Sequence, residues 1–286
     1  MVLAWRFHSI CERGMKILTL ANQKGGVGKS AFVTQFALYL RSLGLSVLVV
    51  DLDHQQNTST PLRLSAAVSV ACFGASSVFE DDNPLALPSQ PFVLVGGDDR
   101  LSFLEREPQR HNAFANRFRA ALRAWARFDV CIIDTNPNPD IRYAIALICA
   151  SHVLAPVQLN QEAISGISAL LGHPRYGIKR IQASLNPDLK FLGIVPNLVE
   201  PTPFQRGNLK ALVTDYGRFL LSRRDEGGIQ FGYIQKRTAI AEAQAAGVFV
   251  ADMSKTSARD TWREIRPVFE MVASGMDLIV PGEVRA

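Results

Sequence analysis

The sequence predicts an α/β fold with a mostly parallel, twisted sheet that has helices on both faces. The first observation behind this prediction is a set of nearly all-apolar runs of strand length, such as residues 45–50 and 128–133, that alternate with runs of helical periodicity. Strands without polar alternation are covered on both faces, which is typical of parallel sheets between helix layers. The second observation is the order strand, glycine-rich loop, helix, strand over residues 17–50, which predicts a right-handed βαβ unit.

Further strands and helices follow the same alternation along the chain. Later strands are predicted at residues 92–95, 128–134, 151–157 and 191–197. Helices are predicted at residues 32–43, 110–127, 161–171 and 255–275. The second of these helices has an apolar stripe at helical spacing, made of Phe114, Phe118, Leu122 and Trp125.

The glycine-rich loop over residues 21–30 is the strongest chemical signal in the chain. In such a loop the backbone N–H groups point at an anion, and the following helix adds its positive end. This pattern predicts that Lys29 reaches the β and γ phosphates of a nucleotide and that the Ser30 hydroxyl ligates Mg²⁺. The predicted nucleotide-binding residues of this segment are Gly25, Gly26, Val27, Gly28, Lys29 and Ser30, and the family resemblance given below adds Lys24 and Ala31.

Carboxylates follow two of the predicted strands. Asp51 and Asp53 come at the end of the strand over residues 45–50, and Asp134 closes the strand over residues 128–134. Open α/β sheets bind their ligands at the carboxyl ends of strands, where these side chains can reach a metal ion or an attacking water. Aspartate is equally ordinary in turns and helix caps, and for Asp51 and Asp53 alone that alternative stays open.

The segment from Lys24 to Ser30 resembles the deviant Walker A motif of the ParA/MinD family of ATPases, which are P-loop NTPases. The resemblance implies that Lys24 crosses to the nucleotide of a partner subunit, so that ATP holds a homodimer together. Residues 51–57 resemble the family's second motif, commonly Asp-Xaa-Asp-Pro-Gln-Gly-Asn, with His54 in place of the proline and Gln56 in place of the glycine.

The third motif that carries the resemblance is a Walker B strand ending at Asp134. It continues with Thr135-Asn136-Pro137, where the family often has Thr-Pro-Pro. The resemblance implies that Asp134 holds Mg²⁺ through a water.

The resemblance also implies residue roles. The catalytic residues are then Lys24, Lys29 and Asp53, with Asp53 orienting the hydrolytic water and approaching Mg²⁺ through a water. Asn197 is the candidate for hydrogen bonds to the adenine base, although an asparagine that turns the chain after a strand is nearly as common. Ala31 stands where the family commonly has a second threonine, so we expect slightly weaker nucleotide binding.

Basic residues are concentrated between residues 204 and 237. Seven of them outnumber three acids there, and this local excess of four is most of the net charge of +5. Several cations on one face are enough for contacts to DNA phosphates without base readout, whereas a solvated helix face is the alternative. Residues 240–243 resemble the family's Ala-Glu-Ala segment, which follows a loop that often contacts DNA. The candidate DNA-binding residues are Arg206, Lys210, Arg218, Arg223, Arg224, Lys236 and Arg237.

These features together predict a short ParA-type (Soj-like) ATPase. We expect a single ATPase domain over residues 15–286 and an N-terminal extension over residues 1–14, with Met15 as an alternative start. The resemblance implies ATP and Mg²⁺ as cofactors and slow hydrolysis that a partner stimulates. It further implies binding to nonspecific DNA and plasmid or chromosome partition with a ParB-like protein, in the cytoplasm and on the nucleoid when ATP is bound.

The same ATPase chemistry also serves the positioning of a protein assembly, so a cargo-positioning ATPase stays an alternative. A MinD-like membrane ATPase is disfavoured, because the tail over residues 279–286 lacks the basic amphipathic helix that membrane binding requires. An iron-protein-type reductase needs cysteines around a cluster, and the spacing of the four cysteines indicates neither metal nor redox chemistry. A non-enzymatic regulator is disfavoured by the presence of Lys29, Asp53 and Asp134.

Overall fold

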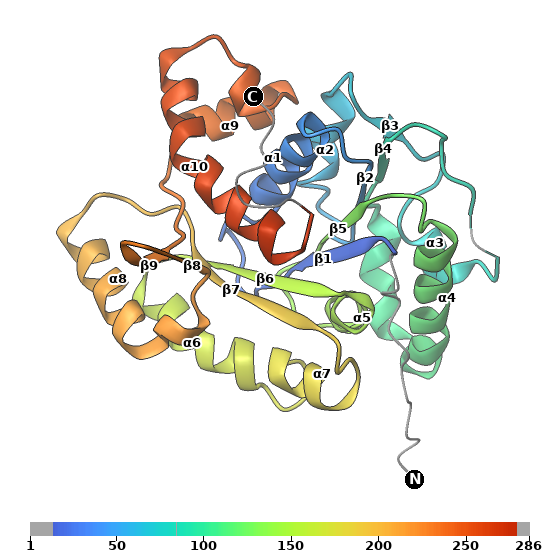
Figure 1. Ribbon diagram of the computed structural model, residues 1–286. Helices are drawn as coiled ribbons and strands as arrows, with labels where there is room; N and C mark the ends of the chain where they lie inside the picture. The colour runs from blue at the N-terminus through green and yellow to red at the C-terminus, as the bar shows by residue number, and fades with distance from the viewer. Residues whose placement is uncertain (1–13, 84, 279–286) are drawn as a thin grey trace.

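The protein is built around a seven-stranded sheet in which every pair of neighbouring strands is parallel (Figure 1). The computed structural model describes residues 14–83 and 85–278. The strand order is β3-β4-β2-β5-β1-β6-β7, which confirms the predicted fold class. The strands are β1 (Lys16–Leu20), β2 (Val47–Asp51), β3 (Ser69–Val70), β4 (Phe92–Val95), β5 (Val130–Asp134), β6 (His152–Val157) and β7 (Lys190–Pro196).

Helices cover both faces of this sheet (Figure 1). One face carries α1 (Lys29–Ser42), α2 (Ser59–Leu64), α9 (Thr238–Ala246), the short helix η4 (Val250–Asp252) and α10 (Thr256–Gly275). The other face carries α3 (Ser77–Glu80), η1 (Asp99–Arg106), η2 (Pro108–Arg110), α4 (His111–Ala124), α5 (Ile141–Cys149), α6 (Gln161–Gly172), α7 (Ile178–Ser184), α8 (Pro203–Tyr216) and η3 (Gly217–Phe219).

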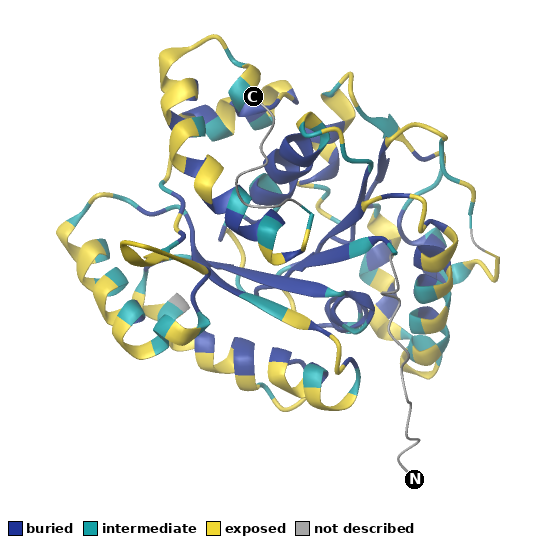
Figure 2. Cartoon of the chain, viewed as in Figure 1, coloured by how far each residue is buried: buried dark blue, intermediate teal, exposed yellow. Residues whose placement is uncertain are grey.

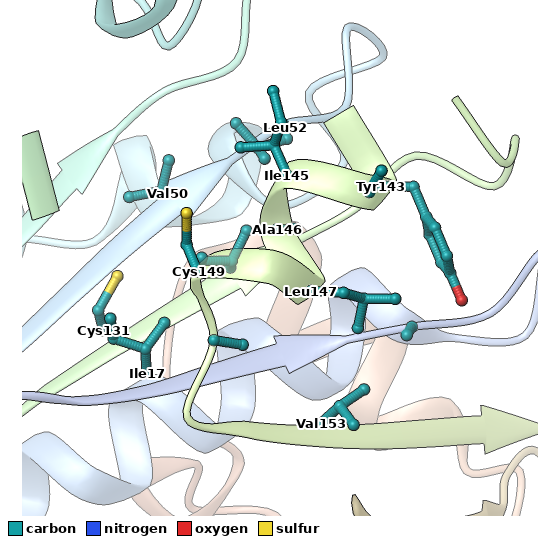
Figure 3. Close-up of a cluster of buried hydrophobic side chains, with 14 of the residues drawn as sticks. Ile17, Val50, Leu52, Cys131, Tyr143, Ile145, Ala146, Leu147, Cys149 and Val153 are labelled. Atoms are coloured by element: carbon teal, nitrogen blue, oxygen red, sulfur yellow. The ribbon is translucent and has the colours of Figure 1, made fainter. Parts of the chain in front are cut away.

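Two hydrophobic cores lie on the two faces of the sheet, and β2, β5 and β6 are buried along their whole length (Figure 2). Beneath the sheet, Ile17 and Cys131 of neighbouring strands face the buried side chains of α5, such as Ile145 (Figure 3). Above the sheet, Phe32 and Phe36 of α1 meet Phe269 of α10 at ring-centroid distances of 5.1 and 5.3 Å. These cores fix the central strands, and with them the loops at their carboxyl ends.

Most predicted elements are present, with boundaries shifted by a few residues. The helix predicted at residues 110–127 is α4, and all four residues of its apolar stripe are buried. Between α8 and α9, however, the chain forms an antiparallel hairpin of β8 (Ser222–Asp225) and β9 (Gly228–Phe231) that the sequence analysis missed. β8 contains no apolar residue, and β9 has only two at alternate positions, Ile229 and Phe231, which is too short a pattern to identify a strand.

Some expectations concern residues that the structure does not describe. The extension over residues 1–14 falls outside it except for Gly14, and so do the tail over residues 279–286 and Cys11. The single domain over residues 15–286 stays a prediction. The described part of the chain contains no helix that is long and apolar enough to span a membrane.

Candidate nucleotide-binding and hydrolysis site

The glycine-rich loop joins β1 to α1, and two of its glycines adopt left-handed backbone conformations. Gly26 has φ 73°, and Gly28, which caps the N-terminus of α1, has φ 80°. Residues with a Cβ pay about 1–2 kcal/mol for this conformation. Gly28 is constrained a second time, because a Cβ at this position would lie 2.5 Å from Nδ2 of Asn197. The spacing of these glycines is therefore a requirement of the backbone.

Side chains from the ends of β6 and β7 hold the carbonyl groups of this loop. Gln158 Nε2 donates to the Gly26 carbonyl at 2.9 Å, and Asn197 Nδ2 donates to the Val27 carbonyl at 2.8 Å. Asn22 Nδ2 donates to the Pro156 carbonyl at 2.5 Å, while its Oδ1 accepts from the Lys24 amide at 2.8 Å. The loop is thus fixed from two neighbouring strands before any ligand binds, which favours rigid recognition of an anion.

Asn197 follows β7 and lies beside the phosphate loop. Its backbone N–H donates to the Val157 carbonyl at 2.7 Å, and its side-chain nitrogen is used by Val27. The amide nitrogen therefore positions the phosphate loop, a role that the sequence did not indicate. Recognition of the adenine base by Asn197 stays a prediction.

The predicted carboxylates converge on Lys29. β5 lies between β1 and β2, and Asp51 pairs in register with Asp134, so the two carboxylates end adjacent strands at the same level. Lys29 is buried, only 6% exposed, where it feels the charges of Asp134 and Asp53, and its Nζ donates to the Asn22 carbonyl at 3.4 Å. The sheet topology thus assembles three motifs that are more than 100 residues apart in sequence at their extremes.

Burial perturbs the charges of this cluster. Burial lowers the pKa of Lys29, and the negative charges of Asp134 and Asp53 partly oppose this. Burial likewise raises the pKa of Asp134, opposed first by the charge of Lys29 and then by hydrogen bonds from Ser30 and Thr58. The Lys29 ammonium and the Asp134 carboxylate therefore support each other's charged forms in a region where neither is well solvated.

Asp51 has a structural position within the cluster. Its Oδ2 accepts from the backbone N–H and the hydroxyl of Ser59 at 2.9 and 2.6 Å, and its Oδ1 accepts from the Asp53 amide at 3.0 Å. Burial, and then the charge of Asp134, raise the pKa of Asp51 to about 7. Asp51 thus holds the start of α2 and the backbone of Asp53, which fits a supporting role.

Asp53 sits at the start of a turn that closely follows β2. Its Oδ1 accepts from the Gln55 amide at 3.0 Å, and its carbonyl accepts from the Gln56 amide at 3.0 Å. Gln56 has φ 58°, the left-handed conformation that a glycine adopts readily. The turn therefore keeps a glycine-like geometry although Gln56 replaces the family's glycine, and Arg63 Nη1 holds the Gln56 side chain at 2.6 Å.

Mg²⁺ fits beside Ser30 and Asp134. Asp134 Oδ2 accepts from Thr58 Oγ1 at 2.6 Å, whereas Oδ1 is buried without a hydrogen-bond partner. Among the described residues, no group of three or more His, Cys, Asp or Glu side chains is placed to hold a metal ion. The donors that suit Mg²⁺ here are the Ser30 hydroxyl and the open Asp134 oxygen, with water and phosphate oxygens completing the shell.

Lys24 points away from this cluster and pairs with a residue that the sequence analysis did not single out. Its Nζ lies 2.6 Å from Oε2 of Glu162, in the first turn of α6, and this contact lowers the pKa of Glu162. Both side chains are solvent-accessible, so the pair is weak and readily exchanged. The only ion pair of Lys24 among the described residues is thus a weak one to Glu162, which another anion can displace.

An apolar pocket opens beside the phosphate loop, between β7, α1, α9 and α10. Hydrophobic pockets with a few polar groups are typical of cofactor sites. Of the pocket's lining residues, the sequence indicated only Gly28, Ala31 and Asn197 as nucleotide-binding. The others gave no such signal, because most of them are apolar residues that read as part of the hydrophobic core. The pocket is lined by Gly28, Ala31, Phe32, Gln35, Asn197, Leu198, Ile234, Ile240, Ile265 and Phe269.

All seven candidate DNA-binding residues are exposed, but their surroundings differ. Lys236 Nζ lies 2.7 Å from Glu200, and Arg237 forms two hydrogen bonds to Glu264, which raises the pKa of Arg237. Each of these two cations therefore has a carboxylate partner within the chain, in a solvent-accessible pair. The described residues contain no ion pair for the other five, which lie on α8, η3 and β8: Arg206, Lys210, Arg218, Arg223 and Arg224.

Three cysteines lie within the described part of the chain, and none of them forms a disulfide. Cys131 and Cys149 are buried, and burial raises the pKa of the Cys149 thiol to about 11. Cys72 is exposed.

Comparison with known proteins identifies the family of this site. A family model described as an AAA domain matches residues 15–191. Protein IncC of Escherichia coli is 32% identical over 280 residues, which cover 92% of this chain and 71% of that protein. The chain belongs to the ParA/MinD family of ATPases. The chromosome-partitioning ATPase Soj of Thermus thermophilus is 32% identical over 254 residues, which cover 84% of this chain and 89% of Soj.

A solved structure agrees with this assignment. Cobyrinic acid a,c-diamide synthase from Mycobacterium smegmatis, with a bound ATP analog and magnesium, superposes with a TM-score of 0.63 and 26% sequence identity. The match covers 82% of this chain and 91% of that chain. The predicted fold class and family are therefore confirmed, while the individual site residues remain predictions that fit the geometry.

Proposed function

We propose that this protein is an ATPase that dimerises on ATP, binds nonspecific DNA, and drives plasmid or chromosome partition with a ParB-like partner. The observation that supports this proposal most is the meeting of Lys29, Ser30 and Asp134 at the carboxyl edge of the sheet, beside a preformed phosphate loop. The similarity to a chromosome-partitioning ATPase directs this nucleotide chemistry towards partition.

ATP and Mg²⁺ are the cofactors that this site suits. The triphosphate brings negative charge to the buried Lys29, which offsets the desolvation of its ammonium group. Ser30 and Asp134 would hold Mg²⁺, which when bound neutralises charge on the phosphate oxygens. The adenine base occupies the apolar pocket beside Gly28, and Asp53 orients the water for attack on the γ phosphate.

Dimerisation follows from the position of Lys24. On binding ATP, Lys24 leaves Glu162 and crosses to the nucleotide of the partner subunit. An exposed ion pair is worth little, so a more highly charged anion displaces Glu162 readily. Hydrolysis removes the shared γ phosphate, and the dimer then separates. Turnover is slow in the isolated protein and is stimulated by the ParB-like partner.

DNA binding depends on the exposed cations of α8, η3 and β8. Each phosphate contact releases a counterion, so affinity falls steeply with salt, and a dimer doubles the number of contacts. Nucleotide-dependent dimerisation thereby switches DNA affinity. The protein is expected in the cytoplasm, and on the nucleoid when ATP is bound.

The test is binding to nonspecific duplex DNA without nucleotide, with ADP and with ATP, across a salt series. Wild type, Lys24→Ala and Asp53→Ala are compared in the same series. The proposal expects tight binding with ATP only, lost in Lys24→Ala and prolonged in Asp53→Ala. ATP-dependent dimers that bind no DNA would reject the partition proposal and favour an ATPase that positions a protein assembly or acts at a membrane.

A further inference from the structure

A buried ion pair lies between the loop that follows β5 and the loop that follows β2. Arg142, in the first turn of α5, is 4% exposed, and its Nε and Nη2 donate to Asp140 Oδ2 at 3.0 and 2.5 Å. Asp140 caps α5 by accepting from the Arg142 amide at 2.9 Å, and it also accepts from Asn136 Nδ2 at 2.9 Å. The guanidinium is thus tied to the loop that begins at Asp134.

The remaining guanidinium nitrogen reaches the other loop. Arg142 Nη1 donates to the Leu52 carbonyl at 3.3 Å and lies 3.4 Å from His54 Nδ1. Leu52 and His54 are the two neighbours of Asp53, and the Leu52 side chain lies against α5 near Ile145 (Figure 3). The backbone at Asp53 is therefore held from two sides, by Asp51 Oδ1 on its N–H and by Arg142 on the preceding carbonyl.

This arrangement joins two departures from the family motifs. Asn136 and His54 each stand where the family commonly has a proline, and a proline offers no side-chain hydrogen bond. In this chain Asn136 binds Asp140, Asp140 binds Arg142, and Arg142 contacts His54. One connected network of polar contacts thus takes the place of two prolines, each of which would have restrained the backbone by its ring.

The buried ion pair of Arg142 and Asp140 adds little to the free energy of unfolding. Removing a guanidinium and a carboxylate from water costs several kcal/mol per ion, and an apolar pair of similar volume is often as stable. What the ion pair supplies is direction, because the planar guanidinium donates along fixed lines to two loops at once. A lysine provides a single charged nitrogen at this position and cannot reach both loops with the same geometry.

We propose that Arg142 is a positioning residue for ATP hydrolysis, which holds the backbone at Asp53 in register with the loop that follows Asp134. This inference rests on the proposed ATPase activity. Arg142 acts through Leu52 and His54, and it neither touches the nucleotide nor transfers a proton. Its removal lets Asp53 drift, and displacements of about 1 Å at a reacting centre cost up to about 100-fold in rate.

The test compares Arg142→Lys with wild type and with Arg117→Lys. Arg117 controls for the Arg-to-Lys change itself, because it also makes two hydrogen bonds to one carboxylate, that of Asp82, but lies on α4 away from the site, in a pair that is more exposed than that of Arg142 and Asp140. Steady-state ATP hydrolysis gives kcat and KM, thermal unfolding reports stability, and hydrogen exchange follows the backbone amides of residues 52–57 and 24–30.

We expect Arg142→Lys to lower kcat about tenfold with KM changed less than about twofold, and to raise exchange in residues 52–57 but not 24–30. Arg117→Lys should change neither quantity. Unchanged kcat and exchange in Arg142→Lys, or equal loss of stability and activity in both variants, would overturn the inference alone. A wild-type protein that does not hydrolyse ATP would overturn the proposed ATPase and this inference together. The exchange rates of residues 52–57 would then show separately whether Arg142 restrains the backbone at Asp53.

Discussion

The three glycines of the phosphate loop allow a graded test of its geometry. Alanine at Gly28 must adopt a left-handed conformation, and its Cβ would also lie 2.5 Å from Asn197 Nδ2. Alanine at Gly26 meets the conformational penalty alone, because no atom lies within 4 Å of its Cβ. Alanine at Gly25 meets neither, since its nearest neighbour is Pro137 Cβ at an ordinary 3.8 Å and its φ is not positive.

The structure sets a magnitude for each substitution. The left-handed conformation costs an alanine about 1–2 kcal/mol, of which roughly 0.4–1 is returned by the reduced entropy of the unfolded chain. At Gly28 the displaced Asn197 also loses its hydrogen bond to Val27, which is worth about 1 kcal/mol, and the clash adds strain of about 1 kcal/mol or more. We therefore expect no loss, or a gain of up to about 1 kcal/mol, for Gly25→Ala, a loss of about 1 kcal/mol for Gly26→Ala and a loss of about 3 kcal/mol for Gly28→Ala.

The assay is urea unfolding of the nucleotide-free protein, so that lost contacts to ATP do not enter the comparison. Binding of a fluorescent ATP analogue is then measured separately for each variant. Equal losses for Gly26→Ala and Gly28→Ala would refute the role of the Asn197 contact. A loss at Gly25 as large as that at Gly28 would refute the whole geometric explanation.

Three further predictions follow from individual residues. Burial, with Lys190 and Lys16 nearby, lowers the pKa of His152 to about 4 from its ordinary value near 6.5, so its contribution to stability is present above pH 6.5 and is lost as the pH falls towards 4. His152→Gln should reduce this acid sensitivity, measured as the change in Tm between pH 7 and pH 5. Arg224→Ala should lower the salt slope of DNA binding by about 1 per subunit in ATP, whereas Lys236→Ala should change it less because Glu200 already pairs with that lysine. Ala31→Thr should tighten ATP binding about fivefold through one added hydrogen bond, as measured by isothermal titration, and unchanged affinity would contradict this reasoning.

The fold was predictable because its signals are local and repeated. Central strands buried on both faces, such as β2 and β5, are continuous apolar runs, and the glycine-rich loop fixes the order of the first unit. The β8–β9 hairpin was not predictable, because β8 is entirely polar and β9 offers only the two apolar residues Ile229 and Phe231. Similarly, the two-residue strand β3 is too short to show any periodicity.

The sequence predicted those site residues that belong to a local motif with a known chemical role. Lys29, Ser30 and Asp134 were indicated by their position after a strand, and the sheet brings them together. The partnership of Lys24 with Glu162 and that of Arg142 with His54 were not indicated, because each joins segments that are far apart in sequence. Without a local pattern, such contacts emerge only from the three-dimensional arrangement.

The position of β5 between β1 and β2 has a consequence for how the chain acquires its site. β1 and β2 carry the first two motifs, yet they do not pair with each other, and each pairs with β5 instead. During synthesis, about eighty residues therefore follow β2 before β5, the strand that joins β1 to β2, has been made. The phosphate loop and its carboxylates come together only once β5 has joined β1 and β2, so ATP can stabilise the finished sheet but has no complete site on its precursors.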